Sequence, residues 1–97
     1  METIRSFVHR DNVFKAFYYH GNGGGVEIRG LLRFMNPHGS GKPDSKYDLC
    51  SRGIIIQVSE STWLYVPFYS YVFQNPRSHT WLALPQEDFK LLHKEIE

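Results

Sequence analysis

Residues 26–34, with the sequence VEIRGLLRF, decide the predicted fold. Every second residue from Val26 onward is apolar or glycine, and the residues between them are Leu31 and three charged residues. Successive side chains of a β-strand point to opposite faces, so this alternation predicts a strand with one face in the core. The opposite face would present Arg29 and Arg33 to solvent. The sequence therefore predicts a strand with an exposed basic face.

The segments before this strand are predicted from their aromatic and glycine content. Residues 2–9 favour a short helix or turn, and residues 13–20 are rich in aromatic side chains and favour a strand. For residues 3–20 as a whole, the apolar spacing leaves helix and strand both open. The run GNGGG at residues 21–25 predicts a hairpin connection, because glycine reaches positive φ without a Cβ clash.

The middle of the chain is predicted to form a loop and further strands. Residues 36–47 are polar and contain two prolines and two glycines, which predicts a long loop. Residues 53–59 include three consecutive isoleucines and predict a strand at the centre of the sheet. Pro67 interrupts the aromatic stretch 63–73 and cannot donate a ladder hydrogen bond, so this stretch is an edge strand, a bent strand or two shorter strands.

The C-terminal part is predicted to form a turn, a strand and a helix. Residues 75–78 favour a turn, and residues 79–84 favour a returning strand. Pro85 and the two acidic residues that follow it closely predict a helix over residues 85–97. The whole chain, 1–97, is thus predicted to be a single α+β domain. Its antiparallel, strongly twisted sheet of about five strands would carry the C-terminal helix on one face.

Composition narrows the class of protein. No run of about 18 apolar residues occurs, so no membrane-spanning helix is expected, and the first residues lack the pattern of a signal peptide. A single cysteine, Cys50, cannot form an internal disulfide, which favours the cytoplasm of a cell or of an infected host. A chain of 97 residues buries a limited fraction of its surface, so homodimerisation is a further expectation.

No catalytic or metal-binding motif is complete. GSGK at residues 39–42 lacks the first glycine and the hydroxyl residue of a phosphate-binding loop, and the histidines and Cys50 show no ligand spacing. We therefore expect a non-enzymatic protein with no metal and no cofactor. Two alternatives stay open: nucleophilic catalysis by Cys50 with a histidine, and acid–base catalysis by His38 with Asp44 or Asp48.

Aromatic and basic residues instead favour a binding function. Single-stranded DNA or RNA is bound by aromatic rings that stack on bases and by cations that contact phosphates. The candidate nucleic-acid-binding residues are Arg29, Arg33, Lys42, Lys46, Arg52 and Tyr19, with Phe17 and Tyr47 as further aromatic candidates. The alternative is a protein antagonist, such as a phage or viral inhibitor of a host factor or an immunity protein. Its candidate interface residues are Trp63, Tyr65, Tyr69 and Tyr71.

Residues 15–64 also contain motifs similar to those of a known family. VEIR at 26–29, MNPHGSGKP at 35–43 and RGI at 52–54 followed by Trp63 resemble motifs of the single-stranded-DNA-binding transcriptional coactivators known as positive cofactor four. The resemblance implies a curved antiparallel sheet, dimerisation and unpaired DNA lying across the sheet. It also implies Arg29, Lys42 and Arg52 as the matched contact positions.

Overall fold

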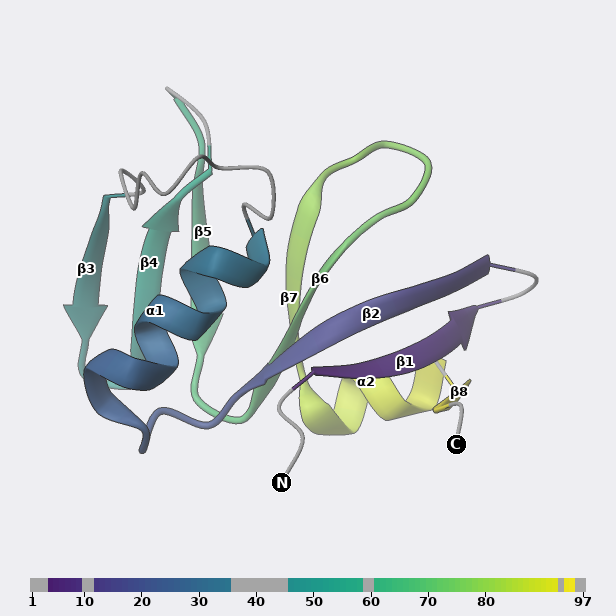
Figure 1. Cartoon of the computed structure of the whole chain (residues 1–97), viewed down its shortest axis with the longest axis horizontal. Coiled ribbons are helices and arrows are strands. Elements are labelled where there is room, and N and C mark those ends of the chain that lie inside the picture. Colours follow the sequence, from purple (N-terminus) through teal and green to yellow (C-terminus); the bar gives the residue numbers. More distant parts are fainter. Residues whose placement is uncertain (1–3, 10–11, 36–45, 59–60, 93, 96–97) are drawn as a thin grey trace.

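The computed structural model describes residues 4–9, 12–35, 46–58, 61–92 and 94–95 as an α+β arrangement of antiparallel sheets and two helices (Figure 1). The strands are β1 (Ile4–His9), β2 (Asn12–Tyr19), β3 (Tyr47–Cys50), β4 (Gly53–Gln57), β5 (Trp63–Pro67), β6 (Ser70–Gln74), β7 (Trp81–Pro85) and β8 (Lys94–Glu95). The helices are α1 (Gly24–Met35) and α2 (Gln86–Leu92). Neither of these helices has the length and apolar content needed to cross a membrane.

The strands form two sheets rather than the one that was predicted. Sheet A has the order β7-β6-β2-β1-β8, in which the two-residue β8 extends four longer strands. Sheet B has the order β3-β4-β5, and all pairings in both sheets are antiparallel. The strand with the three isoleucines, β4, lies at the centre of sheet B, as its apolar run predicts.

The prediction of a helix or turn over residues 2–9 is wrong for the described part, because this segment is β1. It pairs with β2 along its whole length, and Phe7 lies opposite Phe14 across the hairpin. Phe7 is buried whereas its neighbours Ser6 and Val8 are half-buried, which is the alternation of a strand with one face in the core. The strand predicted over residues 13–20 is confirmed as β2.

The strand predicted over residues 26–34 is wrong, since these residues lie in α1, and GNGGG leads into this helix instead of closing a hairpin. Ile28, Leu31 and Leu32 are all buried, and their spacing places them on one side of a helix. Leu31, which the alternation assigned to the polar face, is fully buried. Arg29 and Arg33, four residues apart, lie on the exposed side of α1.

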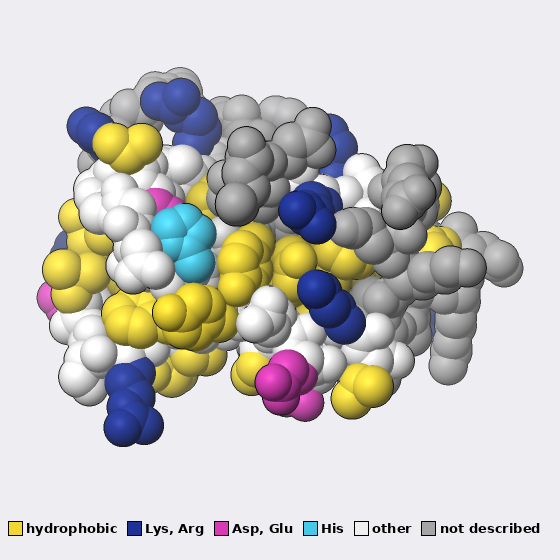
Figure 2. Space-filling model, turned by 90° about the horizontal axis from the view of Figure 1, so that it is seen from below, with side chains coloured by type: hydrophobic (Ala, Val, Ile, Leu, Met, Phe, Trp, Pro, Cys, Tyr) yellow, Lys and Arg dark blue, Asp and Glu magenta, His cyan; other side chains and the backbone are white. Residues whose placement is uncertain are grey.

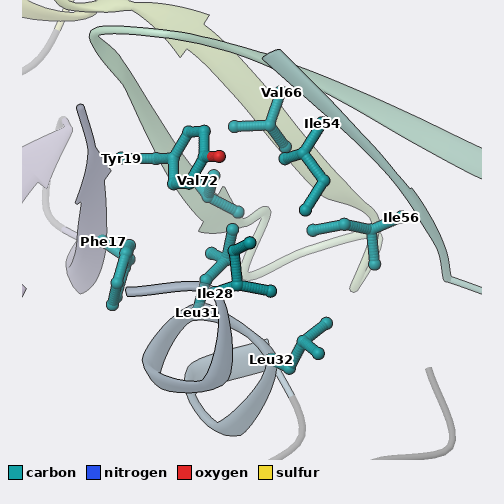
Figure 3. Packing of buried hydrophobic residues seen from close by; sticks show 9 residues of the cluster. All are labelled: Phe17, Tyr19, Ile28, Leu31, Leu32, Ile54, Ile56, Val66 and Val72. Carbon is teal, nitrogen blue, oxygen red and sulfur yellow. The ribbon is translucent and has the colours of Figure 1, made fainter. Parts of the chain in front are cut away.

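The main core lies between α1 and the strands of both sheets (Figure 3). The helix contributes three aliphatic side chains, which meet side chains from β2, β4, β5 and β6. The cluster consists of Phe17, Tyr19, Ile28, Leu31, Leu32, Ile54, Ile56, Val66 and Val72. One face of sheet B and one face of sheet A are therefore buried against each other and against α1.

A second core lies on the opposite face of sheet A, beneath α2. Phe89 of α2 is fully buried and stacks on Tyr71, with a ring-centroid distance of 4.5 Å. The rings of Phe7 and Phe73 approach the Phe89 ring edge-on, with ring-centroid distances of 4.6 Å and 5.2 Å. The predicted C-terminal helix therefore packs on one face of the sheet, but it ends at Leu92 and is followed by β8, which pairs with β1.

The remaining chain follows the predicted order closely. The aromatic stretch forms two strands, β5 and β6, so the third of its three alternatives is confirmed. The chain passes from sheet B to sheet A at a corner after Pro67, where Tyr69 adopts a positive φ of 62°. The turn at residues 75–78 is confirmed, and the returning strand is β7. Of the predicted loop at 36–47, residues 36–45 lie outside the described residues.

Candidate functional site

The outer face of sheet B is the side that points away from α1. Because Ile54, Ile56 and Val66 point into the main core, the alternate residues of β4 and β5 must point outward. Trp63 and Tyr65 lie on this side, two residues apart on β5, with 45% and 48% of their surface exposed. Of the described helices, α1 covers the inner face and α2 packs on sheet A, so neither covers these two rings.

Strand register places further side chains on this outer face. Asp48, Ile55 and Tyr65 form one row across the three strands, and Gln57 lies opposite Trp63. The Tyr65 ring packs over Gly53, because a Cβ at this glycine would lie 3.1 Å from Tyr65 Cε1. The same Cβ would lie only 2.8 Å from the Cα of Pro67, so the absence of a side chain allows β4 and β5 to approach closely here.

The predicted basic residues do not gather on this sheet. Arg29 and Arg33 lie on α1, Arg52 lies in the turn between β3 and β4, and Lys46 precedes β3. Lys42 lies outside the described residues. Figure 2 shows the molecule from below the view of Figure 1, and on this side hydrophobic side chains form a band whereas lysines and arginines lie at several separate places.

The predicted stacking residues Phe17 and Tyr19 are also unsuitable, because both are buried in the main core with 3% of their surface exposed. A nucleic-acid surface that combines Arg29 and Arg33 with the aromatic face of one strand is therefore absent from the described structure. The sheet face predicted for unpaired nucleic acid is wrong in this respect.

Comparison with known proteins adds no relative. No protein-family model, curated protein or solved structure matches the chain. The residues VEIR, with which the resemblance to positive cofactor four begins, lie in a helix here instead of a strand.

The four residues predicted for a protein interface are separated by the fold. Trp63 and Tyr65 lie together on the outer face of sheet B, as described above. Tyr69 is exposed but lies at the corner between the sheets. Tyr71 is wrong as an interface residue, because it is buried in the second core with 3% of its surface exposed.

A polar cluster at the start of α1 was missed by the sequence reasoning. The carboxylate of Glu27, which is buried, accepts hydrogen bonds from the backbone N–H groups of His20 and Gly21 at 3.0 Å and of Gly23 at 3.2 Å. His20 Nε2 lies 3.0 Å from the same carboxylate, and His20 Nδ1 accepts the Asn22 N–H at 3.0 Å. A glutamate four residues after the last glycine before a helix was the available signal for this cap.

This cluster fixes the entry of the chain into α1. Glu27 receives three backbone N–H groups and the imidazole, which match the roughly four lone-pair sites of a carboxylate. The imidazole is satisfied on both nitrogens, with its proton on Nε2. Within the part of the chain that the structure describes, no three His, Cys, Asp or Glu side chains form a metal-binding group.

The negative charge of Glu27 acts on two neighbouring tyrosines. Burial raises the pKa of Tyr18 above its ordinary value of 10.0, and Tyr69 and Glu27 raise it further. Burial likewise raises the pKa of Tyr19, again with a contribution from Glu27. The Tyr18 hydroxyl donates a hydrogen bond to Gln86 Oε1 at 3.3 Å, which links β2 to the start of α2.

These raised pKa values predict a loss of stability in alkaline solution. The folded protein holds the two phenolic protons more tightly than the unfolded chain does, so their contribution is complete below the unfolded pKa of about 10 and is lost as the pH rises through the folded values. Urea unfolding at a series of pH values should show the free energy of unfolding falling above about pH 10. In the double variant Tyr18→Phe/Tyr19→Phe the fall should be shallower, and equal slopes in the two proteins would contradict this explanation.

Proposed function

We propose that this protein is a small non-enzymatic binding protein that recognises another protein through the outer face of sheet B. The observation that supports this proposal is the exposure of Trp63 and Tyr65 on a sheet face that no described helix covers. Large aromatic side chains cost little conformational entropy to immobilise and are enriched among residues that dominate the energy of protein interfaces.

The surroundings of the two rings resemble the layout of a protein interface. Ile55 lies beside Tyr65 and supplies apolar surface between the strands. Asp48 lies at the other end of this row, on the edge strand β3, where its charge would stay close to solvent. An apolar centre with charged groups at its margin is typical of protein interfaces.

Protein recognition is favoured over nucleic-acid recognition by the charges near this face. A nucleic-acid face needs a group of cations beside the stacking rings. Here the row through Tyr65 ends in the carboxylate of Asp48, and the row through Gln57 and Trp63 ends at Lys46, so a carboxylate accompanies the ammonium group. Arg29 and Arg33 belong to α1, which lies on the inner side of sheet B. Binding of single-stranded DNA or RNA to the two rings is the alternative, and the oligonucleotide measurement described below distinguishes it from protein recognition.

Site-specific photocrosslinking tests the proposal. A benzophenone amino acid would replace Tyr65 on the outer face or, as a control, Leu91, which is 83% exposed on α2. After irradiation in the cell of origin, we expect a discrete protein adduct from position 65 and none from position 91. Because the second ring belongs to the same face, the adduct should disappear when Trp63→Ala is added.

Three results would contradict protein recognition through this face. The first is an adduct at position 65 that persists with Trp63→Ala, and the second is equal labelling from both positions. The third would come from fluorescence anisotropy with labelled oligonucleotides at two salt concentrations. Salt-sensitive binding that Trp63→Ala abolishes would assign the face to single-stranded nucleic acid instead.

A further inference from the structure

The strand β3 forms one edge of sheet B, and its apolar side chains are poorly covered. Register places Tyr47 opposite Ile56 and Leu49 opposite Ile54, so both lie on the inner side of the sheet. The two isoleucines are buried at 1% and 0%, whereas Tyr47 is 43% exposed and Leu49 is 67% exposed. The inner side chains of β4 are therefore covered by α1, whereas the inner side chains of β3 stay exposed to solvent.

The backbone of β3 has hydrogen-bonding groups directed away from the sheet. The Gln57 N–H donates to the carbonyl of Lys46 at 2.8 Å, so the polar groups of Lys46 face β4. The direction of these groups alternates along a strand, so the N–H and C=O groups of Tyr47 and Leu49 point toward the free edge. Among the described strands, β4 is the one that pairs with β3.

We propose that this edge pairs antiparallel with β3 of a second copy, about a two-fold axis at Tyr47. The two Tyr47 residues would then exchange both backbone hydrogen bonds across the axis. Lys46 of each copy would lie opposite Asp48 of the other copy. These flanking pairs are of the non-hydrogen-bonded type, in which the side chains approach most closely.

Charge selects this register from the three that the strand allows. Residues opposite each other in a sheet have side chains on the same face. A two-fold axis perpendicular to the sheet must therefore place one residue opposite its own copy, and on β3 this residue can be Tyr47, Asp48 or Leu49. An axis at Asp48 would place the two carboxylates opposite each other. An axis at Leu49 would place Lys46 opposite Arg52 by register position. The axis at Tyr47 is the arrangement with two reciprocal pairs of opposite charge.

The same arrangement would cover the open part of the core. The two Tyr47 rings would meet on the inner side of the joined sheet, and Leu49 would lie diagonally from Tyr47 of the other copy. Pairing would also remove an exposed strand edge. The outer face that carries Trp63 and Tyr65 would remain free, so this inference does not depend on the proposed function.

Charge reversal provides the first test. Sedimentation velocity should show wild-type dimers at about 100 µM, a high concentration chosen because short edge pairings are weak. Asp48→Lys and Lys46→Asp should each raise the dissociation constant at least about tenfold, since each places like charges opposite each other twice. The double variant Lys46→Asp/Asp48→Lys should restore the dimer, because the pairs of opposite charge are re-formed.

A proline substitution tests the backbone pairing directly. The Tyr47 N–H points away from β4, so Tyr47→Pro should remove both Tyr47–Tyr47 hydrogen bonds of the dimer without removing a bond of the β3–β4 ladder. This variant should be monomeric with an unchanged circular dichroism spectrum, whereas Trp63→Ala and Lys90→Glu on α2 should remain dimeric. A monomeric wild type, or single charge reversals that still dimerise, would overturn the inference. A folded double-reversal variant that stays monomeric would do the same.

Discussion

Replacing Phe89 with alanine is expected to lower the free energy of unfolding by about 3–5 kcal/mol. The Phe89 side chain is fully buried between α2 and sheet A, and its ring contacts those of Phe7, Tyr71 and Phe73. Its removal would leave a cavity at the centre of the second core, which the surrounding rings could fill only in part. The effect should be large because this residue is the described core contact between α2 and the sheet.

Chemical denaturation followed by far-ultraviolet circular dichroism would measure this loss. Leu91→Ala is the matched control, since Leu91 lies in the same helix and is 83% exposed. Its effect should stay within about 0.5 kcal/mol, the usual range for exposed sites. Equal stability of the two variants would show that α2 does not depend on Phe89 for its attachment.

Replacing Glu27 with alanine is expected to lower the free energy of unfolding by roughly 2–4 kcal/mol. Each hydrogen bond to a charged group contributes about 1.5–3 kcal/mol, and water can replace some of the hydrogen bonds that the carboxylate makes. The carboxylate holds three backbone N–H groups and the imidazole of His20 at the start of α1. Without it, these donors would lack their acceptor, and the first turn of the helix would lose its favourable negative charge.

Two comparisons make this prediction specific. Glu27→Gln keeps the shape of the side chain and one carbonyl oxygen but directs an NH₂ group at other donors. Its free energy of unfolding should therefore lie between those of the wild type and Glu27→Ala. Glu87→Ala, at an exposed position in the first turn of α2, should change stability little. A Glu27→Ala variant as stable as Glu87→Ala would show that the cap contributes nothing measurable.

The local residue pattern predicted the secondary structure correctly where it was compatible with a single type of element. The three consecutive isoleucines predict a strand at the centre of a sheet, which is the position of β4, and Pro67 marks the break between β5 and β6. Residues 26–34 failed because their apolar residues satisfy two periods at once. Alternation fits Val26, Ile28 and Leu32, whereas helical spacing fits Ile28, Leu31 and Leu32, and burial of Leu31 decides for the helix.

The candidate binding residues divide in the same way. Trp63, Tyr65 and Tyr71 are similar in type and all lie in strands, so the sequence assigned them to one surface. In the structure the first two face outward from sheet B, and Tyr71 is stacked beneath α2. Which face of a strand becomes covered depends on the position of helices that are distant in the sequence.

The sequence by itself determined an α+β chain with antiparallel strands, a helix near the C-terminus and many aromatic residues. This was possible because strand alternation, turn residues and helix-end signals are local properties of the sequence. Tertiary structure decided that the strands form two sheets and that residues 24–35 are helical. It also decided that Trp63 and Tyr65 stay exposed. These outcomes depend on contacts between distant segments, above all those of Leu31 with the strands of the main core.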